Sequence, residues 1–112
     1  MATYIVGVKL TANSTALNSK LGYVNLRAET AKAWASVGGT LEALYLGIPA
    51  ADWDLIAIGN VPSSEAIFAL ASMTLGTGGI TRSFIQEIFN AEEADAALVN
   101  CGAQAPSAFR ES

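Results

Sequence analysis

The sequence predicts an α+β protein in which four strands form one antiparallel sheet with helices on one face. Four apolar segments alternate with two amphipathic segments in the order strand, helix, strand, strand, helix, strand. Glycine and proline lie between most of these segments, as expected for turns. The 112 residues are 52% hydrophobic and 14% charged, which indicates one folded domain and excludes a disordered chain. The order of the segments is that of the ferredoxin-like βαββαβ arrangement.

A polar segment separates the first predicted strand from the first predicted helix. Residues 3–10, TYIVGVKL, are rich in β-branched and aromatic types and predict a strand. The polar residues 11–20 predict a loop. A helix is expected over 21–37, and the Gly38-Gly39 pair ends it. The apolar positions that recur at helical spacing are Leu21, Val24, Ala28, Ala31 and Ala35.

Two more strands are predicted after this helix. Residues 40–46, TLEALYL, form the first of them, and Gly47 and Pro49 end it. Residues 53–61, WDLIAIGNV, are almost continuously apolar in the middle, so this strand is expected at the centre of the sheet. Pro62 stops it, because proline cannot donate to a strand ladder.

The remaining segments predict a helix, a strand and a final helix. Ser63 is the expected N-cap of a helix over 64–75. Residues 80–89, ITRSFIQEIF, predict the fourth strand. Asn90 caps a further helix, with Glu93 in the position of a capping box.

The predicted sheet is apolar on both faces, which predicts a homodimer. In the first strand Tyr4 and Val6 face one side, while Ile5 faces the other. The predicted helices cover one face only, so the other face needs a second subunit. Two such sheets packed face to face form a dimeric α/β barrel. The low charged fraction also favours an oligomer and leaves an assembly larger than a dimer open. Residues 1–90 are expected to form this ferredoxin-like domain, and residues 91–112 a C-terminal helix and tail.

Charge and composition exclude several functions. The net charge is −4 and the six basic residues form no cluster, which argues against binding to nucleic acid or to an anionic membrane. The chain has no histidine, which excludes a histidine-ligated haem and a Ser-His-Asp or Cys-His pair. No metal or cofactor motif is present, so none is predicted. The single cysteine, Cys101, and the lack of a signal or membrane-spanning segment predict a soluble cytoplasmic protein.

One long segment carries a family pattern: GGTLEALYLGIPAADWDLIAIGNVPSSEAIFALASMTLGTGGITRSFIQEIF. It has a double glycine after the first helix, an aromatic-Asp pair opening the third strand, and a glycine turn before the fourth. This pattern resembles the GYD-domain family of small bacterial proteins, and the resemblance covers roughly residues 1–90. Asp52-Trp53-Asp54 stands where that family has Gly-Tyr-Asp. The resemblance implies a dimeric α/β-barrel fold, which cofactor-independent monooxygenases, polyketide cyclases and lactone isomerases share.

Asp54 and Arg82 are the candidate catalytic residues. Asp54 opens the third strand within an apolar run, and loss of solvent favours the neutral form of a carboxylate, which would suit general acid–base catalysis. Its alternative role is a structural hydrogen bond to the amides of the loop 47–51. Arg82 lies in an apolar strand and needs a partner, which Asp54, Glu42 or a bound anion could supply. Its alternative role is a salt bridge at the edge of a dimer.

Four further residues are candidates for binding a substrate. Aromatic side chains with a polar tip suit the wall of an apolar site. An asparagine beside a tryptophan and a tyrosine would suit a cofactor-independent oxygenase of aromatic substrates. Each of these side chains could instead serve core packing or a dimer contact. The four are Trp53, Tyr45, Asn60 and Tyr4.

Two functional hypotheses follow. The first is a cofactor-independent enzyme, an isomerase, a cyclase or a monooxygenase, that acts on a small apolar or aromatic molecule. The second is a non-catalytic module that binds a small ligand or has a structural, interaction role. The enzyme hypothesis requires a ligand-sized cavity into which Asp54, Arg82 or Asn60 points. Side chains that fill this space would favour the second hypothesis.

Overall fold

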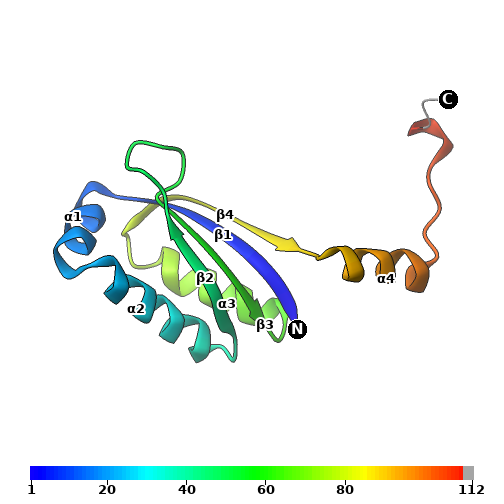
Figure 1. The fold of residues 1–112 in the computed structure, drawn as a ribbon, viewed down its shortest axis with the longest axis horizontal. Coiled ribbons are helices and arrows are strands. Elements are labelled where there is room, and N and C mark those ends of the chain that lie inside the picture. Colours follow the sequence, from blue (N-terminus) through cyan, green and yellow to red (C-terminus); the bar gives the residue numbers. More distant parts are fainter. Residues whose placement is uncertain (110–112) are drawn as a thin grey trace.

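A computed structural model describes residues 1–109 and confirms the α+β class and the four-stranded antiparallel sheet (Figure 1). Four α-helices accompany the sheet in these residues. The elements in chain order are β1 (Ala2–Leu10), α1 (Ala12–Leu21), α2 (Tyr23–Ser36), β2 (Thr40–Leu46), β3 (Leu55–Val61), α3 (Ser64–Leu75), β4 (Ile80–Ile88), α4 (Ala91–Cys101) and a short 3-10 helix (Ser107–Phe109). The last three residues of the predicted tail lie outside the described residues.

The strands lie in the order β2-β3-β1-β4, so β1 and β3 form the centre of the sheet. The two central strands run antiparallel, with Ala2 opposite Val61 and Val8 opposite Leu55. The central position predicted for the third strand is confirmed. This strand order is compatible with the ferredoxin-like arrangement.

The hydrophobic core lies between one face of the sheet and the helices α2 and α3. Leu55, Ala57 and Val61 of β3 point to this helix face, where α3 contributes Leu70. Trp34 of α2 is only 3% exposed and is the largest side chain of the core. A Cβ atom on Gly59 would lie 2.7 Å from the Trp34 ring, so the glycine makes room for the indole. The packing of Trp34 against the sheet therefore depends on glycine at this position.

The segment 11–20, predicted as a loop, forms the helix α1 instead. Thr11 caps it, because the threonine side chain accepts a hydrogen bond from the Ser14 amide at 3.1 Å. Gly22, with φ of 95°, ends α1 and separates it from α2. Since α1 has no buried residue, its sequence carries no apolar periodicity, and this missing signal explains the wrong prediction.

The apolar stripe predicted for the first helix lies outside the core, beside the edge strand β2. Val24 is 72% exposed, and Ala28, Ala31 and Ala35 are exposed as well. A different stripe of α2 packs on the core, because Trp34 and its neighbours remove more apolar area from water than alanines do. This stripe consists of Leu26, Ala33 and Trp34.

Other expected boundaries agree closely with the structure. The predicted helix over 64–75 is confirmed, and the Ser63 hydroxyl accepts the expected capping bond from the Ala66 amide at 3.2 Å. The third strand begins at Leu55 rather than at residue 53, and the fourth ends at Ile88. The capping box of Asn90 and Glu93 at α4 is confirmed.

The helix α4 leads away from the rest of the molecule, and every one of its residues is exposed (Figure 1). The molecule is correspondingly elongated, with extents of 54 × 32 × 22 Å. Leu98 and Val99, which are 68% and 81% exposed, give α4 an apolar surface that the other described residues, 1–90 and 102–109, leave uncovered. Such a surface is typical of a segment that contacts another molecule.

We expect Gly59→Ala to lower the free energy of unfolding by about 1–3 kcal/mol. The added methyl would lie 2.6 Å from the Thr40 carbonyl oxygen and 2.7 Å from the Trp34 ring, so α2 or β2 must shift. Urea denaturation, followed by tryptophan fluorescence at a fixed protein concentration, measures the change. An unaltered midpoint would show that Trp34 does not depend on this glycine.

Candidate functional site

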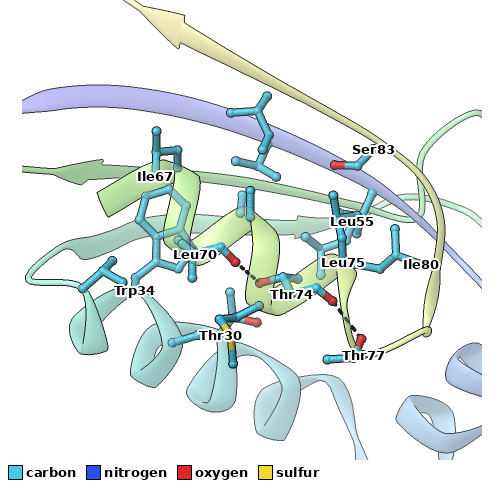
Figure 2. A pocket seen from close by; sticks show the side chains of 18 of the residues that line it. Thr30, Trp34, Leu55, Ile67, Leu70, Thr74, Leu75, Thr77, Ile80 and Ser83 are labelled. Atoms are coloured by element: carbon cyan, nitrogen blue, oxygen red, sulfur yellow. Dashed lines mark hydrogen bonds between the residues drawn. The ribbon is translucent and has the colours of Figure 1, made fainter. Parts of the chain in front are cut away.

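A cavity of about 470 Å³ lies between the helices α2 and α3 and the helix face of the sheet. Its walls are almost entirely aliphatic, with Val6 and Leu55 from the sheet and Leu26 and Leu70 from the helices. Figure 2 shows Trp34 at one end and Ile80 toward the other. A cavity of this size and lining suits a small apolar molecule.

Most polar groups on the cavity wall are already engaged with the backbone of their own helix. The Thr30 hydroxyl donates to the Leu26 carbonyl at 2.7 Å, and the Thr74 hydroxyl donates to the Leu70 carbonyl at 2.7 Å. The Thr77 hydroxyl donates to the Thr74 carbonyl at 2.8 Å, also drawn in Figure 2. Glu29 lies at the exposed margin and pairs with Lys32 at 3.3 Å. The wall therefore offers little acid–base chemistry.

A second group of functional side chains lies at one end of the open face, the sheet face that no helix covers. The Arg82 guanidinium lies 4.8 Å from the ring centroid of Trp53, a cation–π distance. The Trp53 ring meets Phe84 edge-on, with centroids 4.8 Å apart. Arg82 also donates to the backbone carbonyl of Asp52 at 2.9 Å, while the two side chains approach only to 3.9 Å. The interaction partners expected for Arg82, Asp54 and Glu42, are thus replaced by Asp52 and Trp53.

Asp54 holds the start of β3 against the end of β1. It is 8% exposed, and its carboxylate accepts a hydrogen bond from the Leu10 amide at 2.8 Å. Lys9 donates to the other carboxylate oxygen at 3.2 Å and to the Ala51 carbonyl at 2.8 Å. These bonds match the structural alternative for Asp54, although the amide belongs to β1 rather than to the loop 47–51. A carboxylate so engaged satisfies buried backbone groups that would otherwise be costly.

The other candidates lie apart from this group and from one another. Asn60 donates to the Glu42 carboxylate at 2.7 Å, near the opposite end of β3. Tyr45 is 63% exposed on the edge strand β2. Tyr4 is half-buried and packs against the core on the helix face.

The structure thus brings together three of the six sequence candidates, Trp53, Asp54 and Arg82, at one end of the sheet. None of the six lines the cavity. Sequence analysis missed the cavity walls because they consist of ordinary core residues. The available signal was the interruption of apolar stripes by small hydroxyl residues, such as Thr74 in α3 and Ser83 in β4.

No protein-family model matches this chain, and no curated protein is significantly similar to it. Among residues 1–109, no three acidic or cysteine side chains gather where they could bind a metal ion. In the same residues, no helix is long and apolar enough to cross a membrane.

We expect Asp54→Ala to lower the free energy of unfolding by about 1–3 kcal/mol, because the Leu10 amide loses its acceptor. Asp54→Asn keeps one acceptor oxygen and should cost less. The control is Asp52→Ala: that side chain is 91% exposed, so the loss should stay below about 0.5 kcal/mol. Urea midpoints give all three values. Equal midpoints for wild type and Asp54→Ala would refute the structural role.

Proposed function

We propose that this protein binds a small, uncharged, largely apolar molecule in the cavity between α2, α3 and the sheet. The observation that carries the proposal is the cavity itself, about 470 Å³ with aliphatic walls. Its volume falls within the range of about 300–1,000 Å³ typical of small-molecule sites. Burial of the ligand's apolar surface would supply most of the affinity.

The charge of the cavity wall supports an uncharged ligand. Among the described residues no lysine or arginine lines it, and its one charged residue, Glu29, is exposed and paired with Lys32. An anionic ligand would leave water without gaining a counter-ion, which is strongly unfavourable. Because none of the six candidate site residues lines the cavity either, the geometry favours the non-catalytic hypothesis.

The enzyme hypothesis for Asp54 and Arg82 stays a prediction. Both residues lie away from the cavity, so catalysis by them would need a substrate at the open face, beside Trp53 and Phe84. Asp54 would also have to act while it accepts the bonds from Leu10 and Lys9. These requirements make binding without turnover the better supported function.

The proposed assembly is a homodimer in which the open faces of two sheets pack together as a dimeric α/β barrel. Ile5, Ile56 and Ile58 occupy the centre of this face, where a solvated sheet would carry polar residues. A second copy offers a matching apolar surface through two-fold symmetry. The exposed apolar side of α4 would contact the partner subunit.

The proposal also includes a relationship to the GYD-domain family, which the pattern of segments supports. It includes a cytoplasmic location, which the single thiol of Cys101 supports.

Filling the cavity tests the binding function. N-phenyl-1-naphthylamine, an uncharged fluorescent probe, should bind the wild-type protein and gain fluorescence. Ala71→Trp places an indole in the cavity and should weaken this binding at least tenfold, because the probe and the indole compete for one volume. Ser72→Trp, on the adjacent exposed position of α3, is the matched control and should bind as wild type does. Equal binding by both variants would overturn the proposal.

A charge on the open face tests the assembly. Ile58 lies opposite Ile5 at the centre of this face, so Ile58→Lys should convert the dimer to a monomer at micromolar concentration. The lysine can extend into water in the monomer, so circular dichroism should still show a folded sheet with its helix layer. Ile48→Lys, in a loop where Ile48 is 81% exposed, is the control and should remain dimeric. Sedimentation velocity measures the oligomeric state of the wild type and of the two variants. A monomeric wild type would refute the dimer.

A further inference from the structure

Ser83 is the polar residue that β4 places on the cavity wall. It lies opposite Val8 in the β1–β4 ladder, and Val8 is buried on the helix face. Ser83 is half-buried and lines the cavity. Figure 2 shows it on the sheet side, near Leu55, whereas Thr74 and Thr77 belong to the helix side.

Its hydroxyl differs from every other hydroxyl on the wall. Thr30, Thr74 and Thr77 each donate their proton to a backbone carbonyl, and so does Ser36, to Ala33 at 2.6 Å. Among residues 1–109, no side-chain hydrogen bond involves the Ser83 hydroxyl, and its oxygen is not among the buried atoms that lack a partner, so it remains accessible to solvent. The threonine oxygens keep lone pairs, so they can accept, but Ser83 alone has a proton to give.

We infer that Ser83 anchors the ligand by donating a hydrogen bond to a neutral oxygen, so that the cavity takes an apolar ketone, ester or alcohol. This inference rests on the proposed binding function. A donor on an apolar wall discriminates between ligands, because a bound ligand without an acceptor displaces water from the hydroxyl and puts no hydrogen bond in its place. A carboxylate would satisfy the donor but would lack a cation on the wall, so the neutral ligand is preferred.

Three probes with one ring system test the inference by displacing N-phenyl-1-naphthylamine. They are 2-acetylnaphthalene, a neutral ketone; 2-ethylnaphthalene, a hydrocarbon of similar shape; and 2-naphthoate, an anion. Ser83→Ala should raise the Kd of the ketone about two- to tenfold. The Kd of the hydrocarbon should change less than twofold, since it has no acceptor. The anion should bind most weakly to every variant.

Two further variants separate the hydrogen bond from a change in shape. Ser83→Thr retains the donor and should restore ketone affinity relative to Ser83→Ala. Ser72→Ala is the matched control, because it removes an exposed hydroxyl of α3 that does not line the cavity, so both neutral probes should bind as they do to wild type.

The outcomes distinguish this inference from the function on which it rests. If the hydrocarbon displaces the fluorescent probe but Ser83→Ala affects both neutral ligands equally, or neither, the role of Ser83 is refuted and binding stands. Tighter binding of 2-naphthoate than of the ketone would also refute it. If no ligand binds the wild-type protein, the binding function fails and this inference fails with it.

Discussion

The packing of Trp34 on Gly59 is the contact on which the rest of the helix layer depends. The indole attaches α2 to the sheet at the end of β3 where the strand finishes, and it occupies the space above the glycine. Toward the other end of β3 the facing residues, Leu55 and Ala57, meet no side chain of comparable size, and this is where the cavity begins. A single large residue therefore both contributes to the core and closes one end of the cavity. Core and cavity are two parts of one layer rather than separate features.

The two faces of the sheet carry different features. The helix face combines the core with the cavity, and Ser83 contributes a hydroxyl to the cavity wall. The open face has isoleucines at its centre and a polar-aromatic group at one end, where Arg82 stacks on Trp53. Asp54 lies at the junction, since it bonds the Leu10 amide and so joins the start of β3 to the end of β1. In the proposed assembly one face binds the ligand and the other binds the second copy.

Much of the fold could be predicted because its signals are local. Alternating and continuous apolar runs located the four strands, and the side chains of Ser63 and Asn90 marked two helix starts through hydrogen bonds within three residues. The errors occurred where local signals are weak. The helix α1 buries no residue, so its sequence shows no apolar periodicity. In α2, the exposed alanines that suggested the apolar stripe contribute less buried area than Trp34 does. The candidate site was harder still, because a cavity is the space that side chains leave. The positions of Asp54 and Arg82 at the sheet end, away from that space, depend on the register of strands distant in sequence.

The helix α4 has too few stabilising contacts to be a stable helix on its own. Isolated helices shorter than about 12–15 residues are marginal in water, and α4 has 11 residues, none of them buried. Its capping box fixes where it starts but contributes only about 1 kcal/mol to keeping it folded. In the proposed dimer the partner subunit would supply the missing stabilisation, so folding of α4 would be coupled to association and would depend on protein concentration. The sheet would form in each copy alone, whereas the helix α4 would become fully helical only when two copies associate.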